Sequence, residues 1–429
     1  MPTELDAARA LCRFIEASPS PFHAAARAAQ RLEEAGFKPV DEREPLPAGG
    51  RHLLVRGGAL VAWSAPERLA PSFSFRLVGA HTDSPNLRIK PNPDTGRAGV
   101  RQLGVEVYGG ALLNSWLDRD LGLSGRVAVA GEAAGGPPEL VALLVDRPVL
   151  RVPQLAIHLD REVNDKGLVL NRQQHLAPLW ALGAPEEDGF ARFLAGELGV
   201  AVERVLAWDV MCHDLTPPAL LGRDEEFLAA PRIDNLLSCW AGAEALAQQS
   251  AEPDETVVHA LALFDHEEVG SASERGAAGG FLGSVLERIA AAGAGREGYL
   301  AALGASLCVS ADCAHATHPN YADRHEPEHT VALNGGPVVK VNANLRYASD
   351  AATIGAFVDA CRRADVPMQR FVTRSDLACG STIGPLTAAQ LGMPTVDVGA
   401  PQLSMHSARE LCGSADPALL VRALRSFLA

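Results

Sequence analysis

The chain is poor in lysine and in positive charge overall. It has 38 Lys and Arg residues against 52 Asp and Glu residues, which gives a formal charge of −14, and only four lysines (Lys38, Lys90, Lys166 and Lys340). A protein that coats nucleic acid needs a basic surface, so this balance argues against nucleic acid as a partner. A hydrophobic fraction of 47% with a charged fraction of 21% also excludes wholesale disorder.

Signals for export and for membrane insertion are lacking as well. Residues 1–18 have neither the basic start nor the apolar run of a secretory signal. No stretch approaches the roughly 20 uninterrupted apolar residues that cross a bilayer. The eight cysteines are scattered without a CxxC pair, a pattern typical of buried thiols in a reducing compartment. We therefore expect a cytoplasmic protein with no membrane partner.

Several familiar catalytic motifs are also missing. The sequence has no G-x-S-x-G elbow, no G-x-x-x-x-G-K-[ST] loop and no strand-linked G-x-G-x-x-G, which argues against serine hydrolysis and nucleotide-dependent chemistry. Residues 325–329 (HEPEH) match the single-zinc motif H-E-x-x-H in letters. That chemistry needs both histidines on one face of an unbroken helix, and Pro327 breaks a helix there. We interpret this match as accidental.

What is present is a rhythm of strands and helices, interrupted once. A length of 429 residues predicts two or three domains. Strand–helix alternation before residue 93 and after residue 231 predicts an α/β fold, with a mostly parallel sheet flanked by helices. Gly- and Pro-rich turns between β-prone runs indicate a β-rich insert over residues 93–231. The expected α/β domain is therefore discontinuous, formed by residues 1–92 and 232–429.

Acidic and imidazole side chains recur where predicted strands end. They are His81, Asp83, Asp234, Glu267, Glu268, Asp312 and His406. Strand ends are the usual location of a site in an open α/β sheet. A pair of metal ions needs such a set, with imidazoles and carboxylates as ligands, one carboxylate to bridge and one free base.

Two of these clusters permit a more detailed interpretation. Residues i and i+2 of an extended segment point the same way, so Asp83 can hold one ring nitrogen of His81 while the other binds metal. A turn with a helix cap at Asp83 is the alternative. Glu267 and Glu268 follow an apolar strand, and a useful division puts one on metal and makes the other a proton shuttle with a pKa raised by burial.

Taken together, the motifs resemble one family, the aspartyl aminopeptidases, which are co-catalytic dizinc exopeptidases. The similar segments span nearly the whole chain and are residues 79–91, 105–110, 116–120, 155–161, 232–236, 265–271, 310–321, 335–342, 379–385 and 405–410. One departure is Leu345, where the family usually has Gln, and it affects no expected metal ligand. The resemblance implies a dizinc peptidase fold whose β-rich insert is a dimerisation domain.

The resemblance also implies a role for each clustered residue. Asp234 would bridge two Zn²⁺ ions per subunit, with Mn²⁺ or Co²⁺ as possible substitutes. His81 and Asp312 would complete one metal site, and Glu268 and His406 the other. Glu267 would be the general base and acid, and Asp83 would orient His81. The Asp234–Asn235 peptide bond can be strained or cis in such sites.

Further roles concern the substrate and the assembly. The resemblance implies that His158 reaches a neighbouring subunit's site and stabilises the oxyanion, with an interface or strand histidine as the alternative. Lys340, on a predicted strand, needs a partner and could pair with the acidic side chain of a substrate. Lys90 competes for that role less convincingly. His315 and His318 could line the same pocket or simply pack.

These expectations add up to a cytoplasmic metalloaminopeptidase that removes N-terminal Asp or Glu from peptides. The resemblance further implies self-association into a homododecamer built from dimers. Two alternatives stay open. One is a related metal-dependent amidohydrolase, such as a deacylase, with the same ligand set. The other is a non-catalytic assembled scaffold, against which the intact set of metal and proton-transfer residues argues.

Overall fold

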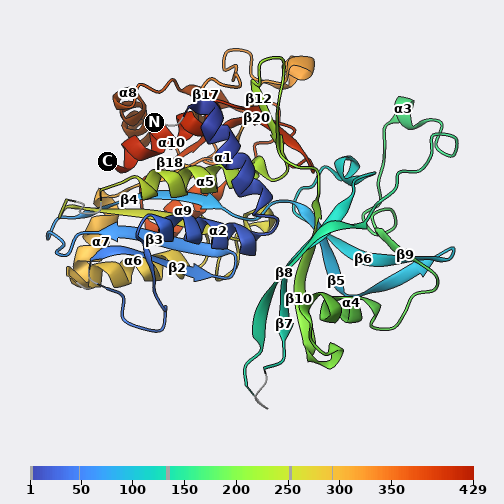
Figure 1. Ribbon diagram of the computed structural model, residues 1–429. Helices are drawn as coiled ribbons and strands as arrows, with labels where there is room; N and C mark the ends of the chain where they lie inside the picture. Colours follow the sequence, from blue (N-terminus) through green and yellow to red (C-terminus); the bar gives the residue numbers. More distant parts are fainter. Residues whose placement is uncertain (1–2, 48, 132–135, 251–253, 292) are drawn as a thin grey trace. The chain divides into compact units, whose positions relative to one another are not determined.

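The computed structural model describes residues 3–47, 49–131, 136–250, 254–291 and 293–429 (Figure 1). Contacts between residues divide the chain into two units. Unit 1 comprises Met1–Asp83, Pro218–Met405 and Glu410–Ala429, and unit 2 comprises Ser84–Pro217 and His406–Arg409. The chain therefore leaves unit 1 after Asp83 and returns to it at Pro218.

A nine-stranded sheet forms the centre of unit 1, with the order β1-β2-β3-β13-β4-β14-β18-β16-β17. Its strands are β1 (Lys38–Pro39), β2 (Gly50–Arg56), β3 (Ala59–Ala65), β13 (Val257–Phe264), β4 (Ser74–His81), β14 (Leu307–Ala311), β18 (Thr395–Gly399), β16 (Val338–Val341) and β17 (Gln369–Val372). The four central strands β13, β4, β14 and β18 run parallel, whereas β3 and β16 run antiparallel to their neighbours β13 and β18. The carboxyl ends of the central strands thus share one edge of the sheet.

Apolar sequence explains why these strands lie inside. Every residue of β3 and of β18 is buried, and in β13 only Val257 is partly exposed. Strands covered on both faces need apolar side chains in both directions, which produces continuous apolar runs rather than alternation. The polar residues that follow such runs are carried to the sheet edge.

Helices cover the sheet in two layers. One core includes residues of α1 (Glu4–Glu16), α2 (Pro21–Glu34), α5 (Ile233–Ala247), α8 (Ala351–Arg363) and α10 (Asp416–Leu428). The other core includes residues of α6 (Phe281–Ala291), α7 (Gly295–Ala305) and α9 (Ile383–Leu391). Figure 1 shows these helices around the strands of unit 1. The predicted α/β class, with a helix-flanked and largely parallel sheet, is confirmed.

A smaller sheet completes unit 1, with the order β11-β12-β20-β19-β15. Its strands are β11 (Ala219–Leu221), β12 (Phe227–Ala230), β20 (Glu410–Gly413), β19 (Pro401–Leu403) and β15 (Ala314–His315). β15 follows closely on β14, and β19 on β18. This sheet therefore extends two central strands of the large sheet beyond their carboxyl ends.

Unit 2 is built on a six-stranded sheet with the order β8-β7-β10-β5-β6-β9. Its strands are β8 (Glu139–Leu150), β7 (Leu121–Val129), β10 (Val205–Asp214), β5 (Asn86–Arg97), β6 (Val100–Tyr108) and β9 (Leu179–Leu182), all paired antiparallel. Helix α4 (Gly189–Leu198) packs Phe190 against Trp180 and Trp208, with ring centroids 6.2 and 5.3 Å apart. These aromatic contacts help to form a core separate from the two cores of unit 1.

The observed units differ in their limits from the predicted domains. Residues 84–92 begin β5 and pair within unit 2, although we expected them in the α/β domain. Residues 218–231 contain β11 and β12 and pair with β20 of unit 1, although we expected them in the insert. Both boundaries between the units depend on pairing between strands that are far apart in the sequence, and local composition does not reveal such pairing. The role of unit 2 in dimerisation stays a prediction.

Within the described ranges, no helix combines the length and the apolar character needed to span a bilayer.

One histidine of the core makes the stability of the fold sensitive to pH. His259 on β13 is 7% exposed, and its Nδ1 has no hydrogen-bond partner among the described residues. Burial, together with the positive charges of Arg76 and Arg51, lowers its pKa from 6.5 to about 4. Between these values the unfolded chain binds a proton that the folded chain does not, so acidification favours unfolding.

We therefore expect the free energy of unfolding to fall as pH drops from 6.5 toward about 4, by up to about 1.4 kcal/mol per pH unit from this group. His259→Gln should flatten this dependence. Urea unfolding at about pH 7 and about pH 5 measures it, with the exposed His158→Gln as the matched control. An equal loss of stability in wild type and His259→Gln would contradict the assignment.

Candidate metal centre

The centre of the site is His81, the last residue of β4. Its side chain is 1% exposed, and Asp83 two residues later is fully buried. The Nδ1 atom of His81 lies 3.0 Å from the backbone oxygen of Asp83 and 3.5 Å from its carboxylate. Because a carbonyl oxygen only accepts, Nδ1 carries the proton of the neutral ring and Nε2 keeps its lone pair. The predicted orienting role of Asp83 thus has a geometric basis in both its backbone and its side chain.

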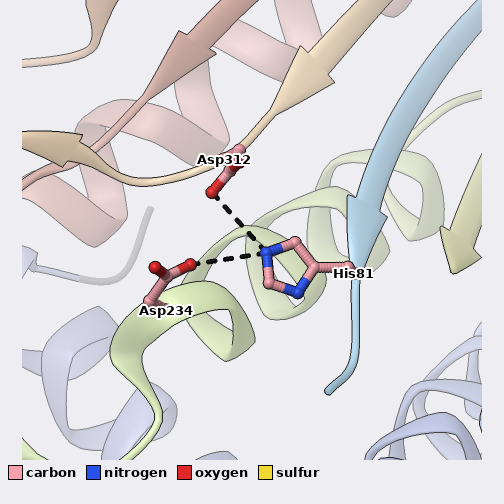
Figure 2. Close-up of side chains that lie close together, drawn as sticks. All are labelled: His81, Asp234 and Asp312. Atoms are coloured by element: carbon pink, nitrogen blue, oxygen red, sulfur yellow. Dashed lines mark ion pairs between the residues drawn. The ribbon is translucent and has the colours of Figure 1, made fainter. Parts of the chain in front are cut away.

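Two aspartates from other strand and helix ends face that lone pair. Asp234 is the second residue of α5, and Asp312 follows directly after β14. Figure 2 shows the Nε2 atom of His81 directed at both carboxylates, at 3.4 Å from Asp234 and 3.6 Å from Asp312. The peptide bond between Asp234 and Asn235 is cis. Three residues that lie far apart in the sequence therefore converge on one point.

The paired glutamates stand on a turn that Asp83 holds. Glu267 and Glu268 open the 3-10 helix η3 (Glu267–Val269), which comes shortly after β13. The backbone N–H of Glu267 donates to one carboxylate oxygen of Asp83 and the N–H of Glu268 donates to the other, both at 3.1 Å. Ligand atoms of His81, Glu267 and Glu268 all lie within 4.8 Å of one another. Asp83 therefore fixes two parts of the site at once.

Crowding of buried charges shifts the protonation of the cluster. Burial raises the pKa of Glu267 and His81 lowers it; together with the negative charges of the nearby aspartates, the net effect is a pKa of about 7. Burial lowers the pKa of His81, but its contacts with the three surrounding aspartates outweigh this and raise that pKa well above its usual value. These contacts favour the charged form of the imidazole.

The donor set fits divalent metal ions. His81, Asp234 and Asp312 are all buried, and they place ligand atoms within 4.8 Å of one another. Imidazole nitrogen with carboxylate oxygen suits Zn²⁺, Mn²⁺ or Co²⁺. The fixed tautomer of His81 offers a lone pair where the two carboxylates meet, so a metal ion would replace the extra proton that the charged cluster otherwise holds.

Lys340 lies beside this cluster on β16. Its ammonium group is 3.2 Å from the backbone oxygen of Cys313 and 3.8 Å from the carboxylate of Asp312. It also lies 5.2 Å from the ring centroid of Tyr347. Tyr347 in turn contacts Phe371, whose ring is 5.8 Å from that of His315. The structure thus connects the two predicted substrate residues, Lys340 and His315, through two aromatic rings.

Two predicted site residues belong to unit 2. His406 lies in the segment His406–Arg409, where its Nδ1 is 3.2 Å from the backbone oxygen of Gly110. His158 is exposed, in a segment whose Leu155 and Leu159 are 58% and 76% exposed. The roles of His406 as a metal ligand and of His158 at a neighbouring subunit's site stay predictions.

The HEPEH segment forms no metal-binding helix. Residues 325–329 consist of bends and turns, as Pro327 predicts. The Nε2 atom of His325 accepts the backbone N–H of His318 at 3.0 Å, and His329 pairs with Glu326. The side chain of His318 accepts the backbone N–H of Asn320 at 3.2 Å and contacts the ring of Tyr321, and its place in the substrate pocket stays a prediction.

Sequence reasoning missed two acidic residues that support the site. The carboxylate of Glu410, 2% exposed, accepts the backbone N–H of Asp234 at 2.9 Å. Asp397 is fully buried on β18 and accepts the hydroxyls of Ser310 and Thr382, both at 2.6 Å. A carboxylate within an apolar strand is the available signal for Asp397, because such a group needs partners. Glu410 lies within a motif similar to the family, but nothing in its spacing reveals its partner.

A buried imidazole and carboxylates beside a glutamate of raised pKa form the kind of site found in metal-dependent hydrolases. The sequence profile of the family described as Aminopeptidase I zinc metalloprotease (M18) matches residues 14–428. The chain belongs to this family, which confirms the resemblance seen in its motifs. It is therefore a zinc aminopeptidase of the M18 type.

Relatives agree with this assignment over their full lengths. A probable M18 family aminopeptidase 2 from Streptomyces coelicolor is 54% identical over 423 residues, which cover 97% of this chain and 96% of the relative. The protein of the same name from Mycobacterium leprae is 53% identical over 419 residues, covering 97% of each chain.

Solved structures show the same fold. A chain in a cryo-EM structure of the Ape4 and Nbr1 complex has a TM-score of 0.94 at 36% identity, covering 99% of this chain and 86% of that one. The mApe1 dodecamer of S. cerevisiae has a TM-score of 0.84 at 28% identity, covering 99% and 96%.

The double contact of Asp83 generates a testable expectation. In Asp83→Asn one carboxylate oxygen becomes an amide that donates, so it faces a backbone N–H without accepting it. We expect the Glu267–Glu268 turn to loosen and zinc affinity to fall by about 10–100-fold, as for other groups that orient metal ligands. Competition with a chromogenic zinc chelator measures this.

The matched control is Asp254→Asn, since that exposed carboxylate also accepts a backbone N–H, from Thr256, close to the start of β13. Unchanged zinc affinity in Asp83→Asn would show that the turn keeps its position without the second oxygen.

Proposed function

We propose that this M18 aminopeptidase removes N-terminal Asp or Glu from peptides with the help of two divalent metal ions. The observation that carries the proposal is the position of Glu267. Its carboxylate lies 4.0 Å from the Nε2 atom of His81, and its pKa is raised to about 7. A carboxyl group that titrates near neutral pH can both accept and return a proton.

The proposed ligands follow the resemblance and agree with the clustering in unit 1. Asp234 would bridge two ions, His81 and Asp312 would complete one site, and Glu268 and His406 would complete the other. When bound, the two ions acidify a water molecule and polarise the scissile carbonyl. Carboxylate and imidazole donors accept Zn²⁺, and also Mn²⁺ or Co²⁺.

Glu267 moves the proton in this mechanism. Its carboxylate accepts a proton from the water that attacks the scissile carbonyl, and the same carboxyl group then donates that proton to the leaving amine. Burial favours the neutral acid that forms between these steps. Asp83 supports the transfer because its contacts with the backbone of the turn hold Glu267 in place.

Replacing the proton carrier tests the mechanism. Glu267→Gln should lower kcat by about 10²–10⁴-fold, since an amide cannot accept the proton, and should keep zinc because the proposed ligands are intact. Turnover of an aspartyl p-nitroanilide by wild type and variant, each after removal and restoration of zinc, measures both effects. Glu274→Gln, which changes an exposed carboxylate shortly after the same turn, is the matched control. A variant with full turnover would exclude Glu267 as the base.

Lys340 supports the preference for acidic residues. It lies 2% exposed beside the metal cluster, where its nearest acidic partner is Asp312 at 3.8 Å. That distance is longer than a direct charge-assisted hydrogen bond, so the ammonium group keeps donor capacity for a substrate carboxylate. His315 lies within the same aromatic neighbourhood and is proposed to line this pocket.

Lys340→Met therefore tests specificity. We expect kcat/KM for aspartyl and glutamyl p-nitroanilide to fall by about 10–100-fold relative to the leucyl substrate, the value of one charge-assisted hydrogen bond. Because Lys340 contacts Asp312, zinc content is measured in parallel, and a loss of zinc would explain an equal loss on all substrates. Arg346→Gln, a nearby exposed cation, is the control. Wild-type cleavage of Leu but not Asp would contradict the acidic preference.

We also propose that the protein assembles from dimers into a homododecamer. The related mApe1 of S. cerevisiae is described as a dodecamer. Exposed apolar side chains flank His158, and burying them against a second subunit would bring that histidine to a neighbouring site. There a charged or donating imidazole can stabilise the oxyanion.

The alternatives make different predictions. A deacylase with the same metal centre would cleave an N-acylated amino acid, whereas the aminopeptidase requires a free α-amine and is blocked by N-acetylation. A scaffold would assemble and act normally with Gln at position 267. The raised pKa of Glu267 favours catalysis over a scaffold role. A cytoplasmic location remains a prediction from cysteine usage.

A further inference from the structure

Unit 2 contains a cavity lined by positive charge. Its volume is about 610 Å³, and it lies between β5, β6 and the segment of residues 172–177. Lys90, Arg97, Arg172 and His175 line it together with polar and small residues, and no Asp or Glu is among the lining residues.

An irregularity in strand pairing shapes this cavity. The register between β5 and β6 shifts between Ile89 and Asp94, so the segment that begins with Lys90 leaves the regular ladder. The Lys90 ammonium group donates to the side chain of Gln173 at 3.1 Å, which links the strand to the facing segment. Asp94, the nearest carboxylate along β5, accepts the backbone N–H of Phe190 at 3.1 Å, so it is engaged with α4.

The cations that line the cavity differ from the other arginines of unit 2 in their ion pairing. Within the described part of the chain, neither Arg97, Arg172 nor Lys90 forms an ion pair. Arginines elsewhere in unit 2 do: Arg101 with Glu186 at 2.6 Å, Arg119 with Asp214 at 3.1 Å, Arg126 with Asp209 at 2.8 Å and Arg151 with Asp120 at 2.6 Å. Like charges around one cavity repel one another, and an anion between them relieves that repulsion.

His175 adds a donor to this lining. Its Nδ1 lies 3.0 Å from the backbone N–H of Asn171 and accepts that hydrogen. The proton of the neutral ring therefore sits on Nε2, so the imidazole donates even when it is uncharged. The guanidinium groups of the arginines and the ammonium group of Lys90 are hydrogen-bond donors only. A ligand rich in acceptors matches this lining, whereas a cation does not.

We propose that this cavity binds a small multivalent anion that carries phosphate groups. Arginine presents a planar fork of donors that matches phosphate oxygens, and lysine adds a point charge. The volume exceeds that of a single phosphate and falls in the range of about 300–1,000 Å³ typical of ligand pockets. None of these residues belongs to the metal centre, so the proposal stands independently of the proposed function.

Calorimetric titration of the full-length, zinc-loaded protein tests this. The probes are ATP and inorganic triphosphate, which share the phosphate chain and differ in the nucleoside. One variant combines Arg97→Gln with Arg172→Gln. The matched control is Arg223→Gln, which changes an exposed arginine of unit 1 outside the cavity. Because the metal centre is intact in all three proteins, binding of phosphates to zinc is equal among them.

We expect the wild type and Arg223→Gln to bind with equal affinity and the double variant to bind at least about tenfold more weakly. Wild-type affinity should also fall as salt rises from about 50 to about 200 mM. Equal affinity for ATP and triphosphate would show that the cavity recognises the phosphate chain. Tighter binding of ATP would show that it recognises a nucleotide.

Either of two results would overturn the proposal: no binding by the wild type, or equal binding by the wild type and the double variant. If the wild type does not bind and the double variant also forms a smaller assembly in gel filtration, the cations are instead assigned to an acidic segment of a second copy. Circular dichroism confirms that each variant is folded.

Discussion

The metal centre depends on the carboxylate of Asp83. One side chain accepts the backbone N–H groups of Glu267 and Glu268 and lies beside the ring of His81, so it connects the ends of two adjacent parallel strands, β4 and β13. Because these contacts use backbone donors, they position the turn whatever side chains it carries. The position of the two glutamates therefore depends on the backbone of the turn, and their side chains remain available for chemistry.

The same arrangement gathers negative charge in a buried place. The carboxylates of Asp234, Asp312 and Glu267 lie close to the imidazole of His81, and repulsion among them favours any bound cation. A fold can hold such a cluster only if the surrounding backbone is fixed independently of it. The parallel strands, the start of α5 and the support of Glu410 provide that frame.

The sequence predicts most of the site residues that belong to unit 1, because these polar residues stand at the ends of apolar runs. His81 ends one buried strand and Asp312 follows another, and the structure brings them together with Asp234. The limits of unit 2 differ from the predicted ones because β12 pairs with β20, and this pairing joins distant parts of the chain. The contact of Glu410 with Asp234 has no local signature. His406 and His158 belong to unit 2, so their roles remain predictions from resemblance.

The position of the insert has a consequence for folding kinetics. His81 and Asp234 are separated by all of residues 84–217, so their contact closes a very long loop in the unfolded chain. Within unit 2, however, β5 near its start pairs with β10 near its end, with Arg88 opposite Met211. Once that pairing forms, the two ends of the insert are neighbours and the remaining loop is short. The pairing of β5 with β10 therefore shortens the loop that the contact of His81 with Asp234 closes, so the rate at which these two proposed metal ligands come together depends on how fast unit 2 folds.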